Sequence, residues 1–240
     1  MASKFMYDLK MKIEGLKRGE IPDTFPDLEA ELSIFSARND YTYEDRVYSY
    51  QARDEYTSRC GFAIISKEWI QPLAKFIGKD KCLEIMGGSG LLSKALKDEG
   101  VNVICTDNLS WEDSKTEWRN HFTEIENLDC VEAIEKYGKD VKYIIMSWAP
   151  YQGKESALAY KKMKEVNPDA VMIYIGEDQG GCTACDEFFE ETELRSTMDY
   201  FEDGDEIPAE LTPDLRHIAS ELNFHFPSFD GIHDRIAFIV

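Results

Sequence analysis

The stretch 81–90, KCLEIMGGSG, carries the strongest structural signal in the chain, because a short apolar run ends there in a turn with three glycines. Residues 91–99, LLSKALKDE, have helical spacing and stop at Gly100, a residue suited to a left-handed helix end. Residues 101–106, VNVICT, form a second apolar run, which Asp107 closes. Strand, glycine turn, helix, strand and acid in this order predict a nucleotide-binding βαβ unit.

The same alternation of short apolar runs and helical stretches continues toward the C-terminus. It predicts further strands at 121–126, 143–146 and 170–175, and helices at 131–137, 155–166 and from Thr212 onward, with Thr212 as the helix cap. The final runs FHFPSF and RIAFIV, joined by DGIHD, are typical of an antiparallel hairpin. The sequence therefore predicts an α/β fold whose doubly wound, mainly parallel sheet ends in a reversed strand. The acidic segment 191–210 is expected to be an insertion.

The first 78 residues differ from the rest. Apolar residues from Phe5 to Leu16 have helical spacing, tyrosines gather between residues 41 and 56, and Ser66 caps a helical pattern that ends at Gly78. We expect residues 1–78 to form a helical, tyrosine-rich cover and residues 79–240 to form the sheet domain. We further expect the tyrosine-rich part to close over a bound substrate.

Composition limits the possible partners and compartments. Of the 240 residues, 27 are Lys or Arg and 47 are Asp or Glu, so the formal net charge is −20. A field of that sign disfavours nucleic-acid binding. Neither a bilayer-spanning apolar run nor a signal-peptide core is found in the sequence. Six scattered cysteines suit reduced thiols. The expectation is a cytoplasmic protein with no nucleic-acid or membrane partner, while its oligomeric state stays open.

The glycine turn admits two cofactor classes, nicotinamide dinucleotides and S-adenosylmethionine. Bare backbone at the turn can approach a ligand closely, and Asp107 can accept hydrogen bonds from both ribose hydroxyls. Glu84 inside the first strand, the spacing E-x-M-G-G-x-G and the reversed final hairpin favour S-adenosylmethionine. Surface roles for the turn and for Asp107 remain the alternative.

The loops after the other strands hold further candidates. SWAPY (147–151) places Trp148 and Tyr151 where an aromatic wall would favour a sulfonium or another cation, or where the rings would simply close the top of the sheet. In GEDQGGCTACDEF (176–188), Glu177 is a candidate base and Thr183 a candidate helix cap; its C-x-x-C lacks a second pair at metal spacing. His233 can titrate near neutrality, although it and Asp234 could equally satisfy turn backbone.

The stretches CGFAIISKEW, LEIMGGSG, SWAPY, IYIGEDQGGCTACDEFF and GIHDRIAF occur in this order. Together they resemble a poorly characterised family of S-adenosylmethionine-dependent, class I methyltransferase-like proteins, over about residues 56–240. The resemblance implies a Rossmann-like, seven-stranded sheet with the last strand reversed and an S-adenosylmethionine pocket. Met86 and Ala149 stand where the family has glycine and proline.

From these patterns we expect an S-adenosylmethionine-dependent methyltransferase that acts on a small-molecule amine or hydroxyl. The alternatives are a non-catalytic module that binds the cofactor or a partner protein, and a nicotinamide dehydrogenase. The predicted cofactor-binding residues are Glu84, Met86, Gly87, Gly88, Gly90, Asp107, Asn108, Asp129, Cys130, Ser147 and Trp148, and the predicted catalytic residues are Glu177, His233 and Tyr151. No metal ligand is predicted.

Overall fold

A six-stranded sheet forms the centre of the part of the chain that the computed structural model describes, residues 4–26, 42–111, 121–199 and 207–240. The strands are β1 (Lys81–Ile85), β2 (Asn102–Asp107), β3 (Glu126–Asn127), β4 (Tyr143–Ser147), β5 (Val171–Gly176) and β6 (Arg235–Ile239). Their order in the sheet is β3-β2-β1-β4-β5-β6. The fold is thus the expected doubly wound α/β class with a Rossmann-like sheet.

Strand β1 is the point from which the sheet grows in both directions. It pairs in parallel with β2 on one side and with β4 on the other, and β5 continues the parallel series beside β4. Strand β6 runs antiparallel to β5, which confirms the reversed last strand. In such sheets a crevice opens at the carboxyl ends of the strands where the order reverses, here between β1 and β4.

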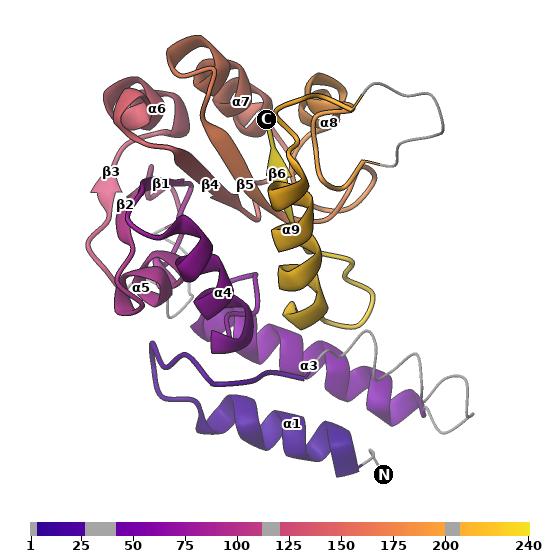
Figure 1. The fold of residues 1–240 in the computed structure, drawn as a ribbon. Coiled ribbons are helices and arrows are strands. Elements are labelled where there is room, and N and C mark those ends of the chain that lie inside the picture. Colours follow the sequence, from indigo (N-terminus) through magenta and orange to yellow (C-terminus); the bar gives the residue numbers. More distant parts are fainter. Residues whose placement is uncertain (1–3, 27–41, 112–120, 200–206) are drawn as a thin grey trace.

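Helices cover both faces of the sheet (Figure 1). On one face lie α4 (Lys67–Ile77), α5 (Leu91–Asp98) and α9 (Pro213–His225), and on the other lie α6 (Cys130–Tyr137), α7 (Glu155–Val166) and α8 (Asp186–Thr192). Successive strand residues serve the two faces in turn: Cys82 belongs to one hydrophobic cluster and Leu83 to the other. This alternation is what a sheet buried on both sides requires.

The N-terminal helices α1 (Lys4–Gly15) and α3 (Tyr43–Arg59) pack against each other next to the α4 side of the sheet (Figure 1). Helix α1 buries Met6, Leu9 and Ile13, which belong to the same hydrophobic cluster as the nearer sheet face. Tyr56 of α3 is buried, and its hydroxyl accepts a hydrogen bond from the Ile65 backbone N–H at 2.9 Å. The division at residue 78 stays a prediction, and this cluster extends across it.

Several expected elements appear with their predicted ends, and others need correction. Helix α7 spans the predicted residues 155–166, and the Thr212 hydroxyl caps α9 by accepting the Leu215 N–H at 3.3 Å. The prediction of a strand in FHFPSF (224–229) is wrong, because α9 continues to His225 and residues 226–229 are irregular. The described residues therefore form six strands rather than seven, and the expected hairpin is absent from them. The third strand is only β3, at the end of the expected run 121–126.

Both edges of the sheet are short or covered. At one edge, β3 has two residues, which pair with Thr106 and Asp107. At the other edge, Thr197 lies beside β6: its backbone N–H donates to the Phe238 carbonyl, and its hydroxyl accepts the Phe238 N–H, each at 3.0 Å. The outer strand β6 thus has hydrogen-bond partners on both of its sides.

Candidate active site

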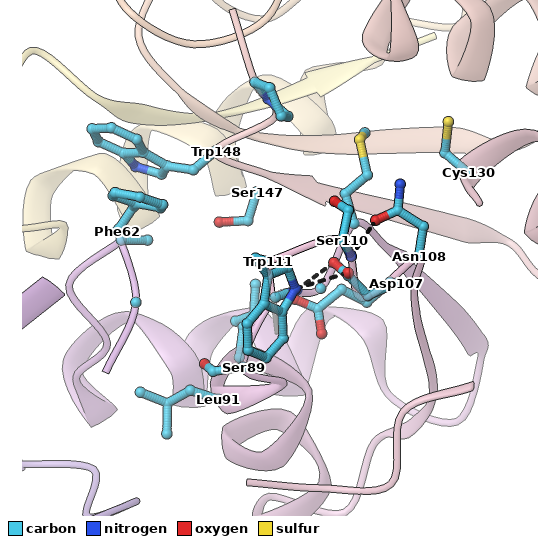
Figure 2. A pocket seen from close by; sticks show the side chains of 18 of the residues that line it. Phe62, Ser89, Leu91, Asp107, Asn108, Ser110, Trp111, Cys130, Ser147 and Trp148 are labelled. Atoms are coloured by element: carbon cyan, nitrogen blue, oxygen red, sulfur yellow. Dashed lines mark hydrogen bonds between the residues drawn. The ribbon is translucent and has the colours of Figure 1, made fainter. Parts of the chain in front are cut away.

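A cavity of about 350 Å³ opens at the carboxyl ends of β1, β2 and β4 (Figure 2). Its size falls within the range of about 300–1,000 Å³ that is usual for small-molecule sites. The described residues that line it are Cys60, Gly61, Phe62, Ala63, Ile65, Glu84, Met86, Gly87, Gly88, Ser89, Leu91, Leu92, Asp107, Asn108, Ser110, Trp111, Asp129, Cys130, Ser147, Trp148, Pro150, Gln152 and Glu155. The cavity therefore lies at the reversal point of the strand order.

The glycine turn leaves no room for a side chain at Gly87 or Gly90, whereas a Cβ at Gly88 would meet no atom within 4 Å. A Cβ added at Gly87 would lie 2.6 Å from the Cys105 Sγ, and one added at Gly90 would lie 2.8 Å from the Thr123 Cγ2. Gly90 also has φ +73°, as the N-cap of α5. Met86 opens the turn at φ 52°, a left-handed conformation in which glycine is usual and other residues are uncommon. The turn therefore keeps the path of a glycine turn with methionine at its first position.

Glu84 brings a buried carboxylate to the floor of the cavity. It is 1% exposed, and its Oε2 accepts hydrogen bonds from the Ser93 N–H at 3.1 Å and from the Ser93 hydroxyl, with the Cys105 thiol at 3.5 Å. Its Oε1 receives no hydrogen bond from the residues that the structure describes. Burial raises the pKa of Glu84 to about 7, against the opposing effect of the Ser93 and Cys105 hydrogen bonds. A cationic group in the cavity would find an available carboxylate oxygen here.

Asp107 at the end of β2 holds the turn and the following loop together. Its Oδ2 accepts the Gly88 N–H at 2.8 Å, and its Oδ1 accepts the Leu109 N–H at 2.7 Å and the Trp111 indole N–H at 2.9 Å (Figure 2). The carboxylate is 5% exposed and lines the cavity. Because a carboxylate has about four acceptor positions, one position remains on Oδ2 for a ligand.

The neighbouring lining residues have structural partners of their own. Asp129 caps α6 by accepting the Val131 and Glu132 N–H groups at 2.8 and 2.9 Å. Burial raises the pKa of the Cys130 thiol to about 11, so the thiol is protonated at neutral pH. Asn108 accepts the Ser110 N–H at 3.0 Å. These contacts fix the wall that follows β2 and β3.

The opposite wall comes from two distant parts of the chain. Phe62, in the connection between α3 and α4, stacks on Trp148 at the end of β4, with ring centroids 5.4 Å apart and an interplanar angle of 16°. The same connection is tied to the glycine turn, because the Ser89 hydroxyl donates to the Cys60 carbonyl at 2.7 Å. The segment Cys60–Phe62 thus spans the cavity from the turn to the β4 loop.

The predicted catalytic residues do not form part of the described lining of this cavity. The Glu177 carboxylate accepts the Cys182 N–H and thiol at 2.7 and 2.8 Å and the His233 backbone N–H at 3.1 Å. Burial alone would raise the pKa of Glu177, but these hydrogen bonds outweigh it and hold the pKa below its usual value. Tyr151 is 46% exposed and follows the lining residue Pro150. None of the three is among the described lining residues.

The structure brings most of the predicted cofactor-binding residues together. Those that line the cavity are Glu84, Met86, Gly87, Gly88, Asp107, Asn108, Asp129, Cys130, Ser147 and Trp148, whereas Gly90 begins α5 just beyond the lining. The lining residues that sequence reasoning did not select are Cys60, Gly61, Phe62, Ala63, Ile65, Ser89, Leu91, Leu92, Ser110, Trp111, Gln152 and Glu155. Pro150 of the β4 loop also lines the cavity; it lies in the SWAPY stretch but is not among the predicted site residues.

The loop after β5 departs from one expectation. Thr183 is not the cap of α8, because that helix begins at Asp186 after Cys185. Instead the Thr183 hydroxyl accepts the Glu177 N–H at 2.8 Å and contacts the Tyr174 hydroxyl at 2.7 Å. The six cysteines are free, and no cluster of His, Cys, Asp and Glu suited to a metal ion occurs among the described residues. No helix within the described ranges is long and apolar enough to cross a membrane.

Comparison with known proteins finds likeness only among solved structures. No protein-family profile and no curated sequence matches the chain. A SAM-dependent methyltransferase from Agrobacterium tumefaciens matches at 15% identity and a TM-score of 0.36, over 48% of this chain and 44% of that one. TehB from Haemophilus influenzae matches at 14% identity and a TM-score of 0.37, over 78% of this chain and 65% of TehB. Human N-acetylserotonin methyltransferase, solved in complex with SAM, matches at 11% identity and a TM-score of 0.33, over 98% of this chain and 66% of the human protein.

Proposed function

We propose that the chain is an S-adenosylmethionine-dependent methyltransferase that acts on a small molecule with an amine or hydroxyl acceptor. One observation carries the proposal: the carboxylates of Glu84 and Asp107 come from the carboxyl-terminal parts of adjacent strands and line one cavity, on either side of a glycine turn that is too crowded for a Cβ at Gly87. A nucleoside joined to an amino acid needs both features, a diol acceptor and a partner for an ammonium group.

The residues present suit this cofactor in three respects. The Asp107 Oδ2 retains an acceptor position for a ribose hydroxyl. The Oε1 of Glu84 accepts no hydrogen bond from the described residues and suits an ammonium group, which would favour the ionised carboxylate and lower its pKa. Gly87 and Gly88 let backbone approach the ligand, and Asp129 and Cys130 border the far end of the cavity, where we assign the adenine.

S-adenosylmethionine, when bound, supplies a methyl carbon already activated by a positively charged sulfonium. The chain then has to align the acceptor, exclude water and provide a place for one proton. Trp148 and Phe62 can serve the first two tasks, because they form an apolar wall of the cavity. A base at Glu177 or His233 stays a prediction, as does Tyr151 as part of the wall of the methyl site, since none of the three is among the described lining residues.

Calorimetric titration with S-adenosylmethionine and S-adenosylhomocysteine tests the cofactor. We expect both to bind, and we expect Asp107→Ala to lower the affinity at least tenfold without unfolding the chain. The loss corresponds to about 1.4 kcal/mol or more, the range for hydrogen bonds to a charged group. Unchanged affinity in the folded variant would contradict the ribose role.

Mass spectrometry of small molecules retained by the purified protein addresses cofactor and acceptor together. Formation of S-adenosylhomocysteine on addition of a retained acceptor would support turnover. Tight cofactor binding with no such product across retained compounds would favour the non-catalytic module instead. Reduction of a bound nicotinamide, visible by its absorbance, would favour a dehydrogenase.

A further inference from the structure

Phe62 and Trp148 form a wall of the cavity that stacking and hydrogen bonds hold in place. Trp148 has φ 51°, and its backbone N–H donates to the Ile175 carbonyl at 2.7 Å. Its indole N–H donates to the Asp234 Oδ2 at 2.9 Å. The ring therefore has a fixed orientation, set from two neighbouring strands and from the turn before β6.

Asp234 is an unusual support for an aromatic ring. Its side chain is 7% exposed, and the Ser228 hydroxyl donates to its Oδ1 at 2.6 Å. A buried carboxylate is costly unless it is hydrogen-bonded, and here one of its oxygens serves the indole N–H. A hydrogen bond to an anion polarises the donor group, which makes the indole ring more electron-rich and more attractive to a cation.

The charges that line the cavity favour the same ligand chemistry. The carboxylate-bearing residues are Glu84, Asp107, Asp129 and Glu155, and none of the described lining residues is Lys, Arg or His. A negative group about 8 Å from one ionised carboxylate loses roughly 30-fold in affinity at an effective dielectric constant of about 20. Phosphorylated or carboxylate-bearing acceptors are therefore disfavoured beside this wall.

We propose that the methyl acceptor is a cationic amine carried on an apolar or aromatic skeleton, and that Phe62 and Trp148 are the specificity-determining residues that bind it. Asp234 is a positioning residue, since it acts on the ligand through Trp148. The role of the amine as methyl acceptor rests on the proposed function. Binding of a cation to Phe62 and Trp148 can be tested separately. A protonated amine must first give up one proton to bulk water; its nitrogen lone pair would then form a bond to the methyl carbon as the bond between that carbon and the sulfonium sulfur breaks, which would leave a neutral thioether.

Two probes that share a phenyl ring but carry opposite charges test whether the wall binds cations. The full chain, saturated with S-adenosylhomocysteine, is titrated calorimetrically with phenyltrimethylammonium and with benzoate. We expect the cation to bind and benzoate to bind at least tenfold more weakly. Phe62→Leu keeps an apolar side chain but removes the π-system, so it is expected to lower the affinity for the cation by roughly 2- to 30-fold. Tyr43→Ala, which removes an aromatic ring that is 81% exposed on α3 and outside the lining, should leave cation affinity unchanged.

Asp234 is tested by two variants that separate geometry from charge. Asp234→Ala removes the acceptor of the indole N–H, whereas Asp234→Asn can keep it and removes only the charge. We expect Asp234→Ala to weaken binding of the cation as much as Phe62→Leu does, and Asp234→Asn to restore part of the loss, with each variant kept saturated with S-adenosylhomocysteine during the titration. Equal binding of benzoate and the cation, or full cation affinity in Phe62→Leu, would overturn the proposal.

The two proposals fail in different ways. If the wild-type chain does not bind S-adenosylhomocysteine but still binds the cation in a Phe62-dependent manner, the methyltransferase proposal is contradicted and the binding wall is supported. If S-adenosylhomocysteine binds and the cation does not, the wall proposal is contradicted and the cofactor site stands.

Discussion

Replacing Glu84 with glutamine should change the pH dependence of stability in a defined direction. The folded-state pKa of Glu84 is about 7, raised by burial from an ordinary value of 4.5. A raised carboxyl pKa means that the folded state favours the protonated form, so this contribution to stability is present below about pH 4.5 and is lost as the pH rises through about 7. Between pH 5 and pH 8 the loss amounts to about 2.5 kcal/mol.

Glutamine at this position stays neutral, and its carbonyl can accept the two Ser93 hydrogen bonds. The free energy of unfolding of Glu84→Gln should therefore rise by about 2.5 kcal/mol relative to that of wild type when the pH is raised from 5 to 8, whatever the effect of the substitution at pH 5. For a chain of this size the gain corresponds to roughly 5–10 °C in Tm. Other buried acids, Asp234 among them, titrate in both proteins and cancel in the difference.

Urea and thermal unfolding of both proteins at pH 5, 6, 7 and 8 measure the effect. Glu124→Gln is the matched control, because Glu124 is exposed and the same chemical change there should give no pH-dependent gain. The reasoning is refuted if the difference between wild type and Glu84→Gln is the same at pH 5 and pH 8. Such a result would mean that the carboxylate is ionised and well solvated in the folded chain.

Three further outcomes follow from the turn and its surroundings. Gly87→Ala should lower Tm and abolish adenosyl binding, because its Cβ would lie 2.6 Å from the Cys105 Sγ; a fully stable variant in a thermal scan would contradict the packing. Trp111→Phe should tighten S-adenosylhomocysteine severalfold by calorimetry, since it frees an Asp107 oxygen for ribose, and weaker binding would show that the indole is itself a ligand contact. Met86→Val should be less stable than Met86→Gly by more than about 1 kcal/mol in urea unfolding, because φ there is 52° and a β-branched residue resists it; the reverse order would argue against that backbone.

Local signals predicted the floor of the site well. The glycine turn and Asp107 follow their strands directly, and in a parallel sheet strand ends meet at one edge, so adjacency could be inferred without coordinates. The spacing of Glu84 likewise placed it beneath the turn. With the exception of Gly90, the predicted cofactor residues around these three groups line one cavity for that reason.

The wall opposite could not be predicted in the same way. Phe62 reaches the cavity because α3 and α4 pack next to the sheet and their connection crosses the glycine turn, an arrangement that depends on tertiary contacts. Only the glycine beside it, Gly61, gave a local sign of a special backbone. Trp111 was missed because its role depends on a side-chain hydrogen bond to Asp107.

Two wrong expectations have the same origin. In each, a local sequence pattern suggested one motif, but the residues form different contacts in the folded chain. FHFPSF alternates like a strand, but its first residues extend α9, where the Asn223 amide donates to the Ile236 carbonyl of β6 and ties the helix to the sheet. Thr183 stands three residues before an acid, as a cap would, but its hydroxyl is held by Glu177 and Tyr174. In both cases the observed arrangement has hydrogen bonds that the expected motif does not include.

The protected rims of the sheet bear on how this chain behaves at high concentration. Unpaired strand backbone is a template for aggregation, and here β3 exposes only two residues while Thr197 occupies the outer side of β6. Together with mutual repulsion from a net charge of −20, this leaves little opportunity for one folded copy to extend the sheet of another. Loss of the Thr197 contact would uncover that template without disturbing the cavity, which lies at the strand ends.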